Sequence, residues 1–342
     1  MRAMVLTQIA KLEANPTPLS LVHLPDPVPS AGQVIIKVST CGVCHTELDE
    51  IEGRAAPTRL PMVLGHQVVG QVVDHHKSAT LYKPGQRLGV AWIYSACGEC
   101  IYCRSGLENL CPQFEATGRD AFGGYAEYMA VPQAFAYPIP DNLTDSAAAP
   151  LLCAGAIGYR SLRLAEIQDG QALGLAGFGA SAHLVLKMMR HKFPASPVYV
   201  FARSPDERAF ALDLGAAWAG SHADSSPVKL HSIIDTTPVW GPVVEALKNL
   251  QPGGRLVINA IRKESHDQQA LLDLDYPRDL WLEKEIKSVA NVTRRDVVEF
   301  LQLAAEIPIQ PEVQEYPLEQ ANLALSELKH RKIRGAKVLR IR

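Results

Sequence analysis

The stretch QALGLAGFGASAHLVLKMMRHK, residues 171–192, sets a glycine loop between an apolar strand and an amphipathic helix. The loop reads Gly177-Phe178-Gly179-Ala180-Ser181-Ala182, a G-x-G-x-x-A pattern. Its glycines let the backbone approach a pyrophosphate, and the small Ala182 lets helix and strand pack closely. The helix N-terminus adds unpaired N–H groups and a partial positive charge. Because a glycine pattern alone often marks only a tight turn, the surrounding elements decide its meaning.

Strands and helices alternate around this loop, beginning after Cys153. Such alternation is typical of a parallel sheet flanked by helices. Leu214-Gly215 and Pro252-Gly253-Gly254 are interpreted as helix stops. The pattern predicts a doubly wound dinucleotide-binding sheet over residues 155–291. Its strands are predicted at Ala172–Ala176, Val198–Phe201, Ala217–Ala219, Ser232–Asp235, Arg255–Asn259 and Ser288–Asn291, and its helices at Ala180–His191, Asp206–Leu214 and Pro242–Leu250.

The remainder of the chain has a different pattern. Residues 1–154 contain short β segments, such as Val34–Val38, Val68–Val73 and Arg87–Val90, separated by glycine and proline. They predict an irregular, mostly antiparallel β domain. Residues 292–342 predict two helices and a last strand that fold back on this domain, at Asp296–Glu306, Leu318–Leu328 and Ala336–Arg340. The expected fold class is therefore α/β, with two domains.

Composition narrows the class of protein. The chain has 342 residues, which is long enough for two cores, and 47% apolar with 20% charged residues is typical of a globular protein. A net charge of −2 provides no field that would attract nucleic acid or an anionic membrane. The N-terminal apolar run is too short for a signal peptide, and no later segment is long enough to span a bilayer. We therefore expect a cytoplasmic protein without nucleic-acid or membrane partners.

Four of the seven cysteines are crowded into one loop. Cys97, Cys100, Cys103 and Cys111 have the spacing C-x2-C-x2-C-x7-C. Four thiolates so placed can enclose one tetrahedral Zn²⁺ with no open position, which is a structural site. The alternative, four buried reduced cysteines, is disfavoured by their crowding. An odd number of cysteines without an export signal also argues against a disulfide framework.

A second set of metal-binding residues is dispersed along the chain. His66, Cys153 and either Cys41 or Cys44 offer an imidazole and two thiolates. Three such ligands with one open position make a catalytic zinc site. Spacing alone does not choose between Cys41 and Cys44, and it does not pick His66 and Cys153 from the other candidates. A lone histidine in a β domain is more often a core or surface residue.

The end of the second predicted strand bears on cofactor choice. NAD enzymes usually carry an Asp or Glu there to bind the ribose hydroxyls. This chain has Ala202-Arg203-Ser204 instead, with Arg208 one turn on. Arg and Ser can donate hydrogen bonds to a 2′-phosphate. The pattern favours NADP(H) over NAD(H), the alternative being that Arg203 caps a surface turn or stacks on the adenine.

Several motifs together resemble the zinc-containing, medium-chain alcohol dehydrogenases over nearly the full length. They are CGVCHTE (41–47), GHQVVG (65–70), the four-cysteine lobe, LLCAGAIGYRSL (151–162), the glycine loop and GGRLV (253–257), all in family order. The resemblance implies a GroES-like catalytic domain joined to a Rossmann domain, with the active site in the cleft between them. It also implies two Zn²⁺ per chain and a homodimer or homotetramer.

The resemblance assigns roles to individual residues. It implies that Cys44, His66 and Cys153 hold the catalytic zinc, and that Cys97, Cys100, Cys103 and Cys111 hold the structural one. Thr46 matches the hydroxyl that hydrogen-bonds the substrate oxygen, and His45 matches a residue near the cofactor phosphate or ribose. Cys41 is left to packing. Trp92 resembles an aromatic residue that lines the substrate pocket and would favour slim primary alcohols, the alternative being a core tryptophan.

Four positions depart from the family pattern. Asp49 stands at the outer end of the proton relay, where a histidine is usual. Glu47 replaces an aspartate and is expected to orient the His66 imidazole. Gln67 replaces a glutamate, so it has no carboxylate to approach the zinc. Ala336 stands where a phosphate-binding arginine is usual, and Arg334, Lys337 and Arg340 are candidate replacements.

The expected reaction is hydride transfer between a primary or small secondary alcohol, or its aldehyde, and NADP(H) or NAD(H). Polyol, threonine and formaldehyde dehydrogenases of the same superfamily are the nearest alternatives. A zinc-free quinone reductase would lack the ligand cysteines. A non-catalytic zinc- and nucleotide-binding module is a distant alternative, because binding alone needs no open metal site.

Overall fold

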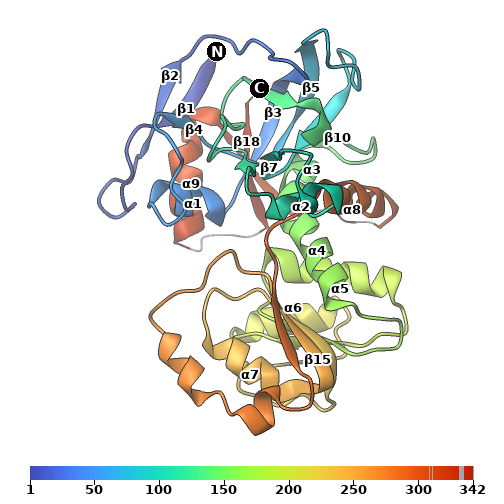
Figure 1. Ribbon diagram of the computed structural model, residues 1–342. Helices are drawn as coiled ribbons and strands as arrows, with labels where there is room; N and C mark the ends of the chain where they lie inside the picture. The colour runs from blue at the N-terminus through green and yellow to red at the C-terminus, as the bar shows by residue number, and fades with distance from the viewer. Residues whose placement is uncertain (308, 310, 331–334, 342) are drawn as a thin grey trace. The chain divides into compact units, whose positions relative to one another are not determined.

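The computed structural model describes residues 1–307, 309, 311–330 and 335–341, which form two compact units (Figure 1). The β unit comprises Met1–Cys153 and Thr293–Arg342, and the parallel-sheet unit comprises Ala154–Val292. The sequence prediction places the boundaries after residues 154 and 291, one residue from each of these. The predicted α/β class, with one mostly antiparallel and one parallel sheet unit, is confirmed.

The β unit is built on a sheet in the order β10-β6-β5-β3-β18-β17, with β9 also paired to β3. All its strand pairs are antiparallel except β17 with β18. The strands are β3 (Gln33–Val43), β5 (Val68–His75), β6 (Arg87–Val90), β9 (Tyr128–Pro132), β10 (Ala136–Pro138), β17 (Val313–Pro317) and β18 (Ala336–Arg340). Two smaller sheets are β2-β1-β4 and β7-β8, formed by β1 (Arg2–Leu6), β2 (Leu19–His23), β4 (Met62–Val63), β7 (Ile93–Ser95) and β8 (Glu115–Ala116).

The C-terminal residues complete this sheet. β18 runs antiparallel to β3, with Leu339 opposite Cys41. The helices of this region are α8 (Arg294–Glu306) and α9 (Ala321–Lys329). α9 buries residues three and four apart, which packs one apolar stripe on the core: Ala321, Ala324, Leu325 and Leu328. The helix predicted from Leu318 starts later, because residues 318–320 form a tighter 3-10 turn. Sequence reasoning also missed β17.

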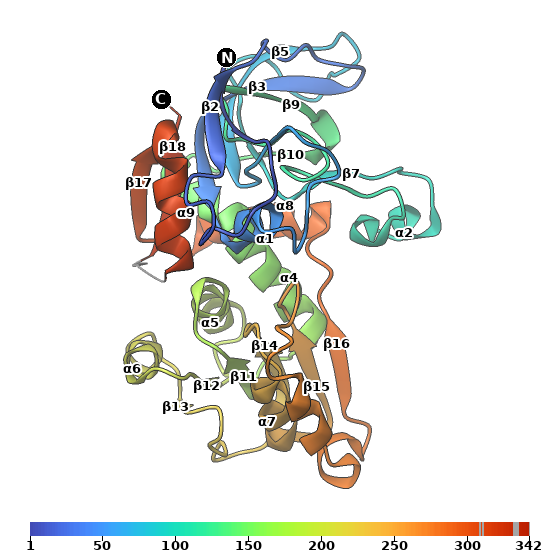
Figure 2. The same cartoon turned by 90° about the vertical axis from the view of Figure 1, so that its left-hand side faces the viewer.

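The parallel-sheet unit has six strands in the order β13-β12-β11-β14-β15-β16, and every neighbouring pair is parallel (Figure 2). This is the doubly wound order of dinucleotide-binding sheets. The strands are β11 (Leu173–Ala176), β12 (Val198–Phe201), β13 (Trp218–Gly220), β14 (Leu230–Asp235), β15 (Leu250–Ile258) and β16 (Glu285–Ser288). The helices are α4 (Ala156–Ala165), α5 (Ala180–Lys192), α6 (Pro205–Asp213) and α7 (Gly241–Asn249).

Two predictions in this unit were wrong. Pro252-Gly253-Gly254 does not stop a helix, because α7 ends at Asn249 and the turn lies inside β15. The turn makes the pairing of β14 with β15 irregular. Leu230 pairs with Leu250, but Ser232 pairs with Arg255. The last strand covers Glu285–Ser288 rather than Ser288–Asn291. It is an edge strand with a polar sequence, so the apolar residues that follow it misplaced the prediction.

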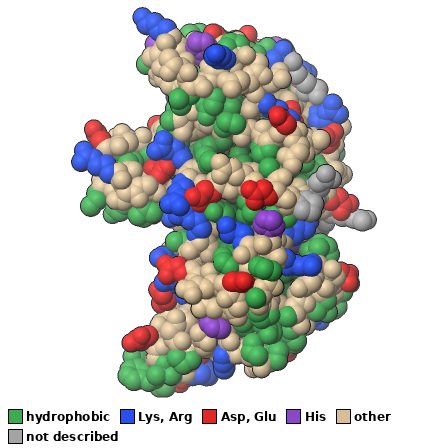
Figure 3. Space-filling view, turned by 90° about the vertical axis from the view of Figure 1, so that its right-hand side faces the viewer, with side chains coloured by type: hydrophobic (Ala, Val, Ile, Leu, Met, Phe, Trp, Pro, Cys, Tyr) green, Lys and Arg blue, Asp and Glu red, His purple; other side chains and the backbone are tan. Residues whose placement is uncertain are grey.

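The surface carries charges of both signs. On the face shown in Figure 3, basic and acidic side chains are interspersed, and neither forms a continuous patch. Across the described part of the chain, every helix is too short or too polar to cross a membrane.

A buried ion pair lies at the carboxyl end of β14 in the parallel sheet. Asp235 ends β14 with no exposed side-chain surface, and its carboxylate pairs with Lys263. The Lys263 ammonium also donates to the carbonyls of Thr237 (2.7 Å) and Val239 (3.0 Å). Burial raises the pKa of Asp235, although Lys263 opposes this. The loop after β14 approaches the glycine loop closely, because a Cβ on Gly177 would lie only 2.7 Å from Thr236 Oγ1.

Replacing Lys263 with methionine should lower the free energy of unfolding by about 3–5 kcal/mol, because it leaves a buried carboxylate unpaired. Urea unfolding followed by circular dichroism measures the loss. The double variant D235N/K263M removes both charges and should recover most of it. A double variant as unstable as Lys263→Met would contradict this account.

Candidate metal and cofactor sites

Three predicted ligands converge in the β unit. Cys44 follows β3, His66 lies between β4 and β5, and Cys153 lies in a π-helical turn at Leu151–Gly155. The Cys44 sulfur lies 3.6 Å from His66 Nε2, and the three ligand atoms lie within 4.8 Å of one another. Tetrahedral zinc, with bonds of about 2.3 Å to sulfur and about 2.05 Å to nitrogen, would separate such atoms by about 3.6 Å. The cluster therefore has the dimensions of a zinc site.

Glu47 orients this cluster. It lies in the first turn of α1 (His45–Ile51), where its Oε2 accepts the backbone N–H of Cys44 at 2.8 Å. Its Oε1 lies 2.6 Å from His66 Nδ1, and both side chains are fully buried. With the Nδ1 proton donated to Glu47, the Nε2 lone pair faces the two cysteines.

Two ligand groups of the cluster hold their protons more tightly than usual. A hydrogen bond with the Cys153 side chain and burial raise the pKa of Cys44 well above its usual value. Burial alone would lower the pKa of His66, but the Glu47 carboxylate and Cys44 sulfur raise it well above the usual value. A metal ion would displace these protons, because it requires thiolates and a neutral imidazole as ligands.

The structure distinguishes the two candidate cysteines of the CGVC motif. Cys44 begins α1 and belongs to the ligand cluster. Cys41 is buried in the core, where a Cβ on Gly65 would lie 2.8 Å from its sulfur and a Cβ on Gly124 3.1 Å. The Cys41 sulfur therefore makes packing contacts with its neighbours.

The four-cysteine lobe, residues 97–111, projects from the β unit and contains α2 (Ile101–Arg104) (Figure 2). The Cys97 sulfur lies 3.5 Å from that of Cys111 and 3.9 Å from that of Cys103, and all four ligand sulfurs lie within 4.8 Å. Four sulfurs at about 2.3 Å from one tetrahedral zinc are about 3.8 Å apart, whereas a disulfide requires about 2.05 Å. Backbone N–H groups of Glu99 and Cys100 lower the pKa of Cys97 to about 7, which favours the thiolate that a metal requires.

Sequence reasoning missed the residue that anchors this lobe. Glu108 is buried, and its Oε1 accepts both the backbone N–H (3.0 Å) and Nε (2.9 Å) of Arg294 at the start of α8. The signal in the sequence was a lone acid between Cys103 and Cys111, but its partner lies 186 residues away.

The residues assigned to proton transfer lie on α1. His45 is exposed and Thr46 is half-buried, with the Thr46 backbone N–H 3.3 Å from the Cys44 sulfur. Asp49 is buried and accepts a hydrogen bond from Arg54 Nε at 2.6 Å. Sequence reasoning did not anticipate Arg54, which gives the predicted relay carboxylate a fixed cationic partner.

A third buried carboxylate of α1 lies one turn beyond Glu47. Glu50 is fully buried, and both its oxygens lack a hydrogen-bond partner among the described residues. Burial and the neighbouring Glu47 charge raise its pKa well above the usual value. Gln67 is also buried and lies over Gly42, where an added Cβ would clash with its side chain. The sequence contained no pattern that distinguished Glu50 from an exposed helix residue.

Trp92 is enclosed by its own neighbours. Its side chain is 9% exposed, its ring lies 5.0 Å from that of Phe114, and the Arg119 guanidinium lies 5.4 Å above it. Its indole nitrogen is buried without a partner in the described part of the chain. The substrate-lining role of Trp92 stays a prediction.

The predicted glycine loop lies at the carboxyl end of β11. Gly177 has a positive φ of 83°, and Gly179 is the N-cap of α5. Gly179 and Ala180 are exposed, so the first backbone N–H groups of α5 are open to an anion. Phe178 is buried instead, with its ring 5.8 Å from that of Phe210.

After β12, one cationic side chain is exposed, and its neighbours stabilise the turn through hydrogen bonds. Ala202 is buried, and Arg203 is exposed. Ser204 caps α6, accepting the Asp206 N–H at 3.2 Å. Arg208 Nη1 donates to the carbonyls of Ala202 (2.9 Å) and Arg203 (3.0 Å). Arg203 is therefore the residue of this set that is best placed to meet a ligand from solvent.

One candidate for phosphate binding near the C-terminus was wrong. Lys337 is buried, and its ammonium is bonded to Gln314 Oε1 (3.0 Å), Glu327 Oε2 (2.5 Å) and the Tyr316 hydroxyl, so it has no donor left for a cofactor. Its position on β18 points it into the β unit. Arg340 pairs with Glu315 at 3.2 Å. Ala336 begins β18, and Arg334 lies outside the described residues.

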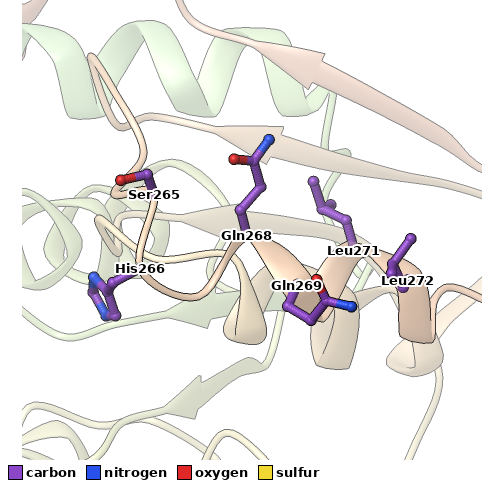
Figure 4. Close-up of a pocket in the computed structure, with 6 residues that line it drawn as sticks. All are labelled: Ser265, His266, Gln268, Gln269, Leu271 and Leu272. Atoms are coloured by element: carbon purple, nitrogen blue, oxygen red, sulfur yellow. The ribbon is translucent and has the colours of Figure 1, made fainter.

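A surface hollow lies in the parallel-sheet unit, away from these residues (Figure 4). It is formed around a 3-10 segment at Gln268–Asp273 that the sequence did not predict. None of the predicted site residues lines it. Its lining consists of Ser265, His266, Gln268, Gln269, Leu271 and Leu272.

Comparisons with known proteins identify the family. Residues 30–141 match the alcohol dehydrogenase GroES-like domain. The chain is 42% identical over 329 residues to the protein named "Probable alcohol dehydrogenase AdhA" from Mycobacterium tuberculosis, covering 95% of this chain and 93% of the relative. Among solved structures, it matches a cinnamyl alcohol dehydrogenase from Sorghum bicolor with a TM-score of 0.81 and 26% identity, over 99% of this chain and 97% of that one.

A cobalt- and zinc-bound thermostable alcohol dehydrogenase from Pyrobaculum aerophilum shares the fold, with a TM-score of 0.85 and 22% identity over 99% of both chains. The fold agrees with these likenesses. The chain thus belongs to the zinc-containing, medium-chain alcohol dehydrogenase family, and its activity class is that of an oxidoreductase acting on alcohols.

Proposed function

We propose that this chain is a zinc-dependent alcohol dehydrogenase and aldehyde reductase, which transfers hydride between a primary or small secondary alcohol and NADP(H). The cluster of Cys44, His66 and Cys153 carries the proposal, because its 3.6 Å sulfur–nitrogen separation fits zinc and three protein ligands leave a fourth position for substrate. The metals named for the Pyrobaculum enzyme support this assignment.

A zinc ion held by these residues would supply a Lewis acid that makes the substrate hydroxyl more acidic. Side chains of the chain itself would orient the ligands and transfer the proton. Glu47 keeps His66 turned toward the cluster, through the 2.6 Å contact at Nδ1. The Thr46 hydroxyl, two residues after Cys44, would accept the substrate proton while passing its own proton on. Asp49 would attract that proton outward, with Arg54 fixing its carboxylate.

The four-cysteine lobe would hold the second zinc. Its sulfurs are spaced for tetrahedral coordination and leave no open ligand position, so the ion would order the lobe without taking part in the reaction. A non-catalytic zinc- and nucleotide-binding module would need only this lobe and the glycine loop. The open three-ligand cluster favours the enzyme.

For the cofactor, the proposal is that NADP(H) is preferred. The exposed N-terminus of α5 suits a pyrophosphate, and exposed Arg203 stands where an acid would repel a 2′-phosphate. The partners proposed are a small alcohol or aldehyde and further copies of this chain, as a homodimer or homotetramer. Neither nucleic acid nor a membrane is among them, and a cytoplasmic location is proposed.

The reaction is tested by steady-state kinetics of the zinc-loaded protein with a panel of alcohols and aldehydes, each with NAD(H) and NADP(H). We expect turnover of small primary alcohols and their aldehydes, and loss of turnover in Cys153→Ser, which removes one ligand of the cluster. Absence of turnover for every substrate in the panel would refute the proposal.

Metal content tests the two zinc sites separately. Two zinc ions per chain are expected, and Glu47→Gln should weaken binding at the Cys44–His66–Cys153 cluster about 10- to 100-fold, because the ligand histidine loses its carboxylate. Competition with a chelator, followed by elemental analysis, measures this. The lobe serves as the internal control and should keep its ion. Unchanged affinity in Glu47→Gln would contradict the role assigned to Glu47.

Arg203→Asp tests cofactor preference. It should shift the ratio of kcat/KM values from NADP(H) toward NAD(H) by about tenfold or more, because a hydrogen bond to a charged group contributes about 1.5–3 kcal/mol. Arg295→Asp makes the same charge change at another exposed arginine, on α8, and should leave the ratio unchanged. A wild type that uses NADH as efficiently as NADPH would rule the preference out.

A further inference from the structure

The Ser181 hydroxyl forms a hydrogen bond that the sequence did not predict. It lies in the first turn of α5, within the glycine loop, and its Oγ donates to the backbone carbonyl of Ala154 at 3.0 Å. Asn259 Nδ2 lies 3.5 Å from the same Oγ on its acceptor side. The hydroxyl is therefore already engaged within the parallel-sheet unit.

The acceptor of this bond is adjacent to a metal ligand. Ala154 follows Cys153 directly, and both belong to the π-helical turn at Leu151–Gly155. Single π-helical turns are rare and occur frequently at functional sites. The peptide that joins residues 153 and 154 also marks the boundary between the two units. The Ser181 bond thus holds the first peptide beyond the ligand.

Ser181 itself is held firmly. Asn259 lies just beyond β15, and its Nδ2 donates to Ser161 Oγ on α4 at 2.7 Å. Its backbone N–H donates to the Asp235 carbonyl at 2.8 Å. A Cβ on Gly158 would lie 3.1 Å from Ser181 Oγ, so α4 approaches the loop closely at a glycine. These contacts leave the Ser181 side chain little freedom to turn toward a ligand.

We propose that Ser181 is a positioning residue that couples the cofactor loop to the metal ligand Cys153. The first turn of α5 offers its backbone N–H groups to the dinucleotide, while the Ser181 hydroxyl on the same turn holds the Ala154 carbonyl. A shift of this turn on cofactor binding is passed to the peptide beside Cys153. The inference rests on the proposed function, since it requires a metal at the cluster and a dinucleotide at the loop.

The test replaces catalytic zinc with Co²⁺, whose visible and thiolate charge-transfer absorption reports on the ligand cysteines. Spectra are recorded for the wild type, Ser181→Ala and Ser232→Ala, before and after addition of NADPH. Ser232 is the matched control, because its buried hydroxyl donates to the Ala165 carbonyl at the far end of α4 (2.7 Å) and does not contact the glycine loop.

We expect the difference spectrum of the wild type to be retained in Ser232→Ala and to be reduced in Ser181→Ala. Ser181→Ala should also bind NADPH about two- to tenfold more weakly, as measured by fluorescence titration. An unchanged difference spectrum in Ser181→Ala would overturn the coupling, and so would an equal loss in Ser232→Ala. A wild type that binds cobalt and NADPH with no spectral change would also overturn it. One that takes up no cobalt at the cluster would overturn the proposed function as well.

Discussion

The contact between Glu47 and His66 is the one on which the proposed catalytic metal site depends. It places a buried carboxylate 2.6 Å from one imidazole nitrogen and so decides which nitrogen faces the cysteines. The same carboxylate accepts a hydrogen bond from the Cys44 N–H, so one side chain fixes both the start of α1 and the position of this cysteine. Burial would be costly for either group alone. Together they are paired, which offsets much of that cost.

Charged groups that are buried elsewhere in the chain are also paired. Lys263 satisfies Asp235 and two carbonyls at the sheet edge, and Lys337 satisfies Glu327, Gln314 and Tyr316 within the β unit. Each pairing consumes the donors of a lysine that would otherwise attract a phosphate. Arg203 differs, because it is exposed beyond a strand end. Charge alone therefore does not identify a cofactor-binding residue, whereas exposure combined with position does.

The extent to which the sequence predicts this molecule follows the range of its interactions. The parallel sheet was predictable because hydrophobic periodicity and the glycine loop are local, and β11, β12 and α5 lie close to their expected bounds. The four-cysteine lobe is likewise local, with ligands inside fifteen residues. The choice of Cys44, His66 and Cys153 came from resemblance rather than spacing. Contacts between distant residues were beyond reach: Arg294 with Glu108, and Lys337 with Glu327, depend on how separate elements pack. Polar strands at an edge, such as β16, also lack the apolar signal that would place them.

The pairing of β18 with β3 has a consequence for how the chain is made. β3 leads to Cys44, and its neighbour in the sheet consists of residues close to the end of the chain. The parallel-sheet unit is continuous, from Ala154 to Val292, so all its strands leave the ribosome before β18 is synthesised. Domains generally fold as units during synthesis. The parallel-sheet unit can therefore assemble first, while the end of β3 that leads to Cys44 lacks its β18 partner until Ala336–Arg340 are synthesised.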